Sequence, residues 1–148
     1  MDACSHRIVG WRTTDRMPVD LPLDMALWAR ADQGWSVAGV THHSGSGNQY
    51  TSICHGRRLE EVGALASVGS VGDSYDNAMA ESVIGLYKTE RVRLDGPFKT
   101  VGQLELATCD WVDYHNRRRV HSSIRYATPI EHENQRHHDQ QQGQPATR

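Results

Sequence analysis

The hydrophobic positions that follow Pro18 recur at helical spacing and predict a helix that ends near Arg30. Its two apolar stripes consist of Val19, Leu23, Ala26 and Leu27 on one side and Leu21, Met25 and Trp28 on another. Asp20 is placed to cap the helix, because a carboxylate there accepts hydrogen bonds from the free amides of the first turn. A helix that is apolar on most sides is expected to be buried.

Two later segments, residues 77–91 and 101–116, also have a helical hydrophobic period. Their apolar faces consist of Met79, Val83, Leu86 and Tyr87 in the first and of Leu104, Ala107, Trp111 and His115 in the second. Thr100, with Gln103 three residues later, has the spacing of a capping box and marks the start of the second helix.

Short runs rich in β-branched and apolar residues predict three strands, at residues 7–13, 37–41 and 65–68. A short helix is expected at residues 52–62. The alternation of strands and helices predicts an α/β domain in which helices cover a small sheet.

Length and composition indicate one domain followed by a tail. The chain has 148 residues, which is typical of one domain. Residues 1–133 carry the pattern, whereas residues 134–148 hold no large apolar side chain and are expected to be disordered. Three cysteines at unrelated spacings argue against a disulfide framework. A net charge of −2 excludes only binding that depends on overall charge, so an anion site would have to be local.

One face of the 77–91 helix combines a carboxylate, a glycine and an ammonium group. Glu81, Gly85 and Lys88 follow each other at i, i+4 and i+7 and therefore line up on one side. A phosphate ligand with a metal would suit this set, since the carboxylate takes the ion and the lysine meets an anionic oxygen. The alternative is a solvated helix face without a ligand.

A dense group of hydrogen-bond donors follows the 101–116 helix. Arg117, Arg118, Arg119 and His121 lie among Tyr, Asn and Ser residues and suit phosphate oxygens. The alternative is structural, because cations at a helix C-terminus stabilise its dipole.

A glycine-rich polar turn at residues 42–50 follows the predicted 37–41 strand. Ligands of open α/β sheets bind outside this end of a strand. The pairs His42-His43 and Cys54-His55 leave a zinc-binding domain open as a further alternative, although neither has zinc-finger spacing.

Together these segments resemble the catalytic core of DDE-type insertion-sequence transposases, which are relatives of retroviral integrases. The resemblance runs through residues 5–11 (SHRIVGW), 42–50 (HHSGSGNQY), 74–82 (SYDNAMAES), 86–90 (LYKTE), 114–123 (YHNRRRVHSS) and 128–129 (TP). It implies a ribonuclease-H-like α/β fold that is incomplete here, because the first two strands of that fold have no counterpart in this sequence. We expect such a fragment to be marginally stable.

The resemblance also implies a catalytic site of three carboxylates that hold two Mg²⁺ or Mn²⁺ ions. Glu81 matches the family's glutamate, and the 35 residues between it and the position of the second aspartate match the family's spacing. That position holds Gly45, which has no side-chain oxygen. Asp2 resembles a non-catalytic acid, so one of the three carboxylates remains and the chain is expected to be catalytically inactive.

The resemblance implies DNA as the partner and the bacterial cytoplasm as the location. Asn77 and Lys88 would face DNA near the site, and Arg117, Arg118, Arg119 and His121 would contact it elsewhere. The leading interpretation is a fragment of a DNA transposase. The alternative is a non-catalytic DNA-binding or regulatory protein that joins an intact transposase or a second copy of itself.

Overall fold

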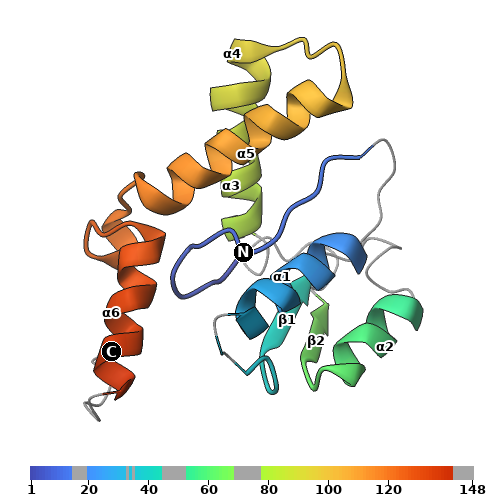
Figure 1. The fold of residues 1–148 in the computed structure, drawn as a ribbon, viewed down its shortest axis with the longest axis vertical. Helices are drawn as coiled ribbons and strands as arrows, with labels where there is room; N and C mark the ends of the chain where they lie inside the picture. Colours follow the sequence, from blue (N-terminus) through green and yellow to red (C-terminus); the bar gives the residue numbers. More distant parts are fainter. Residues whose placement is uncertain (15–19, 33, 35, 45–52, 69–77, 142–148) are drawn as a thin grey trace. The chain divides into compact units, whose positions relative to one another are not determined.

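A computed structural model of the chain describes residues 1–14, 20–32, 34, 36–44, 53–68 and 78–141 (Figure 1). The described chain divides into two compact units, one formed by Met1–Ile8 with Leu106–Arg148 and the other by Val9–Glu105. The elements are α1 (Asp20–Asp32), β1 (Thr41–Ser44), α2 (Ile53–Glu61), β2 (Leu65–Val68), α3 (Ala78–Tyr87), the π-helix η1 (Lys88–Val92), α4 (Arg93–Asp95), α5 (Val101–Arg117), the 3₁₀-helix η2 (Ser122–Ile124) and α6 (Pro129–Gln141). No helix of the described residues is both long and apolar enough to cross a membrane.

The sheet within the described residues has two parallel strands, β1 and β2, with Thr41 paired to Leu65 and Ser44 to Val68. The crossover helix α2 ends at Glu61, and Gly63 two residues later has a φ of +69°, which suits glycine. The Gly63 amide donates to the Glu60 carbonyl at 3.0 Å and the next amide to Leu59 at 2.9 Å. The predicted α/β organisation is confirmed in this β1–α2–β2 unit.

The first strand begins later than its hydrophobic run predicts. Residues 37–40 form a turn in which the Val40 amide donates to the Val37 carbonyl at 3.2 Å. Gly39 has a φ of +78°, a conformation that is unfavourable for other residues, and it directs the chain away from a strand before Thr41.

The predicted strand at residues 7–13 is wrong, because this segment has no regular structure. A strand needs a neighbouring strand to take up its backbone hydrogen bonds, and none of the described strands lies beside this segment. The Asn116 side chain replaces that neighbour at Ile8. It accepts from the Ile8 amide at 2.9 Å and donates to the Ile8 carbonyl at 3.0 Å.

The prediction that α1 is apolar and buried on most sides is only half right. Leu23 is 7% exposed, whereas Met25 and Trp28 on the second stripe are 40% and 71% exposed. One side of α1 packs on α2, and Arg58 Nε lies 2.5 Å from Asp24 Oδ1 between these helices. The core of this unit within the described residues is therefore small.

Regular structure continues beyond Asn134, where the sequence predicts a disordered tail. Helix α6 continues to Gln141, and residues 142–148 lie outside the described residues. Thr128 and Pro129 begin the helix favourably, and Gln135 Nε2 donates to Asp139 Oδ1 one turn later at 2.8 Å. Gln and Arg, which have good helix propensity, make up half of residues 134–141, and this polar stretch extends α6 without a buried apolar face.

Candidate nucleic-acid and metal site

The predicted catalytic face lies on α3 and at the start of η1. Glu81, Gly85 and Lys88 are all exposed. The helix does not continue as a regular α-helix to Arg91, because η1 begins at Lys88 and the Arg93 amide donates to the Lys88 carbonyl five residues back. The regular turns before Lys88 keep Glu81 and Lys88 on one side, as predicted. Single π-turns of this kind are frequent at functional sites.

The glycine on this face has open space around it. A side chain added at Gly85 would meet nothing within 4 Å. The Gly85 carbonyl accepts from the Thr89 hydroxyl at 2.9 Å, and the Ala78 carbonyl accepts from Ser82 in the same way at 2.7 Å. Nothing in the described residues requires a glycine at this position. The candidate role of Gly85 is therefore to give a ligand access to the helix backbone.

The described residues do not fit the two-metal centre that the resemblance implies. The Glu81 side chain is exposed, and among the described residues no group of three His, Cys, Asp or Glu could hold a metal ion. Gly45 and Asn77, the other predicted residues of this site, lie outside the described residues. Because glycine has no side chain, position 45 cannot supply the carboxylate that the two-metal centre needs there.

Two of the histidines named for a possible zinc site, His42 and His55, are in contact. The rings of His42 on β1 and His55 on α2 are edge to face, with centroids 5.1 Å apart, and His55 is 3% exposed. Burial, followed by the charge of His55, lowers the pKa of His42. Structural zinc takes four ligands, and among the described side chains no third ligand joins this pair.

The three predicted arginines differ in their surroundings. Arg117 Nε donates to Asp113 Oδ1 at 2.8 Å one turn earlier on α5, in an exposed ion pair. Arg118 is exposed, and the Arg119 guanidinium lies 5.5 Å from the centre of the Tyr114 ring. The amides of Arg118 and Arg119 both donate to the Tyr114 carbonyl at 2.9 Å, and these bonds close the C-terminus of α5.

His121 is part of a cluster of three imidazoles. Its ring centroid lies 4.9 Å from that of His115 and 5.5 Å from that of His6. Burial, followed by the charges of His115, His6 and Arg119, lowers the pKa of His121 to about 4. The imidazole is therefore neutral at physiological pH. It could offer a hydrogen bond to DNA, but it adds no positive charge to the arginine group.

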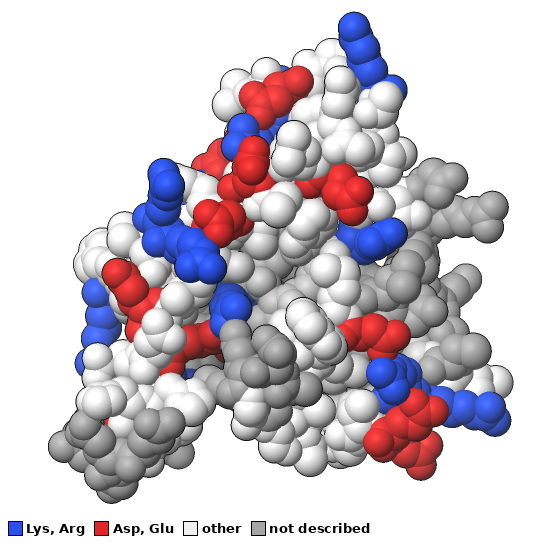
Figure 2. Space-filling model, viewed as in Figure 1, with Lys and Arg blue, Asp and Glu red and all other residues white. Residues whose placement is uncertain are grey.

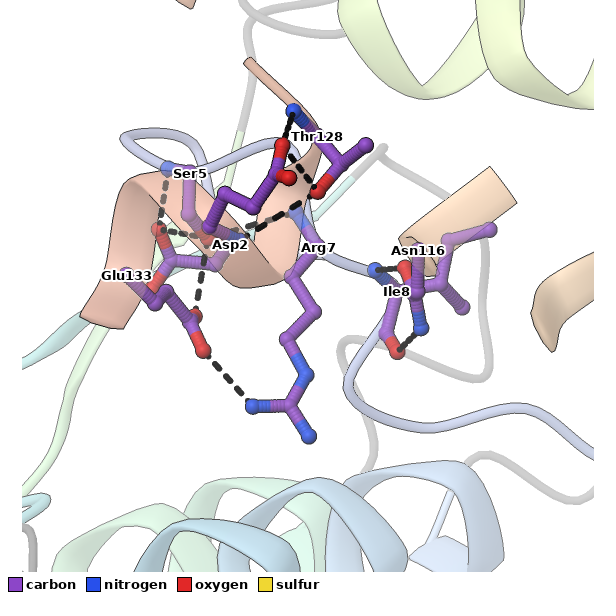
Figure 3. A network of polar contacts seen from close by, with 8 residues as sticks. Asp2, Ser5, Arg7, Ile8, Asn116, Thr128 and Glu133 are labelled. Carbon is purple, nitrogen blue, oxygen red and sulfur yellow. Dashed lines mark hydrogen bonds and ion pairs between the residues drawn. The ribbon is translucent and has the colours of Figure 1, made fainter. Parts of the chain in front are cut away.

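A polar network that sequence reasoning missed ties the start of the chain to α5 and α6 (Figure 3). Glu133, 6% exposed, accepts from Ser5 Oγ at 2.8 Å and pairs with Arg7 Nη1 at 2.6 Å. Asn116 holds the Ile8 backbone as described above. His115 is fully buried, with Nε2 3.1 Å from the His6 carbonyl oxygen. We call these four contacts the terminal clasp.

Asp2, which the resemblance left outside the catalytic set, has a local structural role next to this clasp. Its Oδ1 accepts from the amides of Cys4 and Ser5, both at 2.9 Å, and so stabilises a tight turn. No local sequence signal predicts the clasp, because Ser5 and Arg7 are separated from Glu133 by 128 and 126 positions.

A capping box at the start of α6 was missed although its signal is local. Glu131 Oε2 accepts from the Thr128 amide at 2.9 Å, and the Glu131 amide donates to Thr128 Oγ1 at 3.3 Å. The hydrogen bonds from the Thr128 amide and hydroxyl lower the pKa of Glu131. A threonine, a proline and a glutamate at these spacings are the expected signature of a helix start. At α5 the Thr100 part of the predicted box is present at 3.2 Å, whereas Gln103 accepts from the amide of Lys99 instead of that of Thr100.

Most of the chain is similar in sequence to known proteins. Residues 63–129 match the integrase core domain family. The chain is 43% identical over 134 residues to the putative transposase for insertion sequence element IS986/IS6110 of Mycobacterium tuberculosis, which covers 88% of this chain and 48% of that protein. It is 44% identical over 136 residues to the transposase for IS629 of Shigella sonnei, covering 90% of this chain and 44% of that protein. The chain thus spans about half the length of these relatives.

Proposed function

Because the chain is a relative of insertion-sequence transposases and carries sequence of their integrase core domain, we propose that it binds DNA as part of a transposase core and has no strand-transfer activity of its own. The proposed inactivity rests on the sequence at position 45, where Gly45 replaces a carboxylate, and on the exposed side chain of Glu81, which joins no metal-binding group among the described residues. A divalent cation held by one exposed carboxylate keeps most of its water and binds weakly. No step through a metal follows from these residues.

DNA binding is supported by the local distribution of cations. From Tyr114 to Ile130 the sequence contains Arg117, Arg118, Arg119 and Arg125 and no Asp or Glu. On the face shown in Figure 2, Lys and Arg side chains are interspersed with Asp and Glu. Contacts to phosphates therefore come from short basic segments, and exposed contacts of this kind give salt-dependent affinity with little sequence preference. With DNA as its partner and bacterial transposases as relatives, the proposed location of the chain is the bacterial cytoplasm.

The DNA half of the proposal is tested by fluorescence anisotropy with a 30-base-pair duplex across a salt series. We expect the logarithm of affinity to fall linearly with the logarithm of salt concentration, and Arg118→Ala to lower that slope by about 1. Glu105→Ala, an exposed change on α5 outside the basic segment, is the control. Duplex affinity that does not depend on salt, or no binding at low salt, would contradict the proposal.

The metal half is tested by calorimetric titration with Mn²⁺. The chain is expected to show no saturable site below millimolar concentration. Gly45→Asp should create one if position 45 adjoins Glu81, and adding Glu81→Gln to that variant should remove it. Tight Mn²⁺ binding by the unmodified chain that depends on Glu81, or Mn²⁺-dependent cleavage of DNA, would overturn the proposed inactivity.

A second candidate function, regulation of an intact transposase, is favoured by exposed apolar side chains. Leu94 on α4 is 75% exposed and Ile84 on α3 is 51% exposed. Large exposed apolar side chains are candidates for contact with a partner protein. Co-expression with an intact relative should lower transposition, and Leu94→Lys should weaken that effect. An unchanged transposition frequency would exclude this function.

A further inference from the structure

The segment from Arg118 to Ala127, which we call the basic loop, has a defined shape. His121 and Ala127 form an antiparallel bridge at its base, and the Tyr126 amide donates to the His121 carbonyl at 2.9 Å. Between them η2 turns the chain, and Ile124, 5% exposed, anchors it in the core. The basic loop is thus held at its base and centre by hydrogen bonds and one buried side chain.

Two consecutive residues at the end of this loop have left-handed backbone conformations. The φ angles of Arg125 and Tyr126 are 60° and 59°. Side chains other than those of Gly, Asn and Asp rarely adopt this region, so each residue carries strain. Nothing in the core requires these residue types, because both side chains are exposed. Strain of this kind at exposed positions is often retained for binding.

The Tyr126 ring is the largest apolar group that the loop presents to solvent. It is 73% exposed, and no ring contact or cation–π contact with another described residue covers it. An uncovered aromatic ring on a rigid turn provides a stacking surface with little entropy left to lose on binding. A base of a nucleic acid has a face that fits such a surface.

The charge of the basic loop favours an anionic ligand. Arg118, Arg119 and Arg125 lie within the loop, and the loop contains no carboxylate. The nearest carboxylate that follows in sequence, Glu131, already accepts hydrogen bonds from Thr128 in the α6 capping box. The basic loop therefore combines cations for phosphates with an aromatic ring for a base.

We propose that the basic loop is a binding site for unpaired nucleotides of DNA, in which Tyr126 stacks on a base and Arg118 and Arg125 contact the flanking phosphates. Paired bases are already stacked on both faces within a duplex, so the ring selects a single strand or a frayed end. This inference rests on the proposed DNA-binding function and adds to it the form of DNA that is recognised.

The test compares the affinity of the full chain for a fluorescent 20-nucleotide oligothymidine and for a duplex of the same length. Tyr126→Ala should weaken single-strand binding by roughly 5- to 100-fold and change duplex binding less than about twofold. Tyr126→Phe should retain single-strand binding, because stacking uses the ring and not the hydroxyl. Trp28→Ala, which removes an equally exposed aromatic ring from α1, is the matched control.

Several outcomes overturn this inference without touching the proposed function. One is duplex binding that persists while Tyr126→Ala leaves single-strand affinity unchanged. Another is an equal loss for both forms of DNA, which would make Tyr126 a general contact. A third is Tyr126-dependent binding to phosphatidylserine vesicles without single-strand binding, which would identify a lipid surface. Failure of the unmodified chain to bind either form of DNA would instead overturn the proposed function itself.

Discussion

Helix α3 and the C-terminal half of α5 carry motif residues of the same resemblance but lie in opposite environments. α3 is rich in apolar residues, yet none of its residues is buried. In α5, Trp111, His115 and Asn116 are buried, and two of these three are polar. Motif residues of α5 thus serve to hold the chain together, whereas Glu81 on α3 and Lys88 at the start of η1 are exposed.

The difference shows that buried polar contacts, and not only an apolar pattern, can join distant segments of a small protein. The carboxylate of Glu133 and the side chains of Asn116 and His115 are removed from water and have partners of matching geometry. Such groups specify one arrangement, because any other leaves a buried polar group unsatisfied. An apolar helix surface imposes no comparable requirement on its neighbours.

The largest expected effect is the loss of the clasp carboxylate. Glu133→Ala removes the acceptor for Ser5 and the partner of Arg7, which is 22% exposed at its side chain. We expect the free energy of unfolding to fall by roughly 2–4 kcal/mol, measured by urea denaturation. Glu105→Ala should change it by less than about 0.5 kcal/mol. Equal effects of the two variants would mean that the clasp does not stabilise the chain.

A smaller loss is expected at the α6 capping box. Thr128→Ala removes the side-chain acceptor for the Glu131 amide and should lower the free energy of unfolding by about 1 kcal/mol. Thr128→Ser retains the hydroxyl and should retain most of the stability. Thermal denaturation followed by circular dichroism measures both variants. A melting temperature that is the same for alanine and serine would show that the box is not stabilising.

The histidine cluster predicts a dependence of stability on pH. Because the pKa of His121 is lowered to about 4 in the folded chain, the unfolded chain binds its proton first as pH falls. Stability is complete above the ordinary pKa near 6.5 and is lost between about pH 6.5 and pH 4. Solvent screening around this partly exposed ring limits the loss of unfolding free energy to about 1 kcal/mol.

His121→Gln isolates that contribution. The lowered pKa of His42 adds a loss of the same sign in the other unit, so the comparison is between the pH profiles of the variant and the unmodified chain. The variant should have the flatter profile between pH 6.5 and 4, measured by urea denaturation at each pH. Parallel profiles would contradict the assignment to His121.

The smallest expected effect has the opposite sign and lies on α3. Gly85→Ala adds a methyl group in open space on an exposed helix and should raise the free energy of unfolding by about 0.5–1 kcal/mol. If the glycine admits a DNA backbone, the same variant should weaken duplex binding. Greater stability with unchanged DNA affinity would show that Gly85 has no part in the interface.

The sequence predicts those elements whose signals are local. Three elements lie close to their predicted bounds, namely α5, β2 and the short helix α2 that precedes β2. Residues 7–13 do not, since their β-branched pattern describes a preference that only a neighbouring strand can satisfy. Spacing also predicted that Glu81 and Lys88 lie on the same side of the helix, because helix geometry alone decides which residues share a side.

Pattern and spacing determined the α/β alternation and the helix face of Glu81, Gly85 and Lys88, and the resemblance identified Gly45 as the position that lacks a carboxylate. Each depends on residue identity or on contacts within a few turns. Only the tertiary structure decided that Asn116 supports Ile8 and that Glu133 joins Ser5 and Arg7. It also decided that His121 is neutral and that Tyr126 is exposed beside Arg125. Those properties depend on burial and on partners distant in sequence, which no local pattern contains.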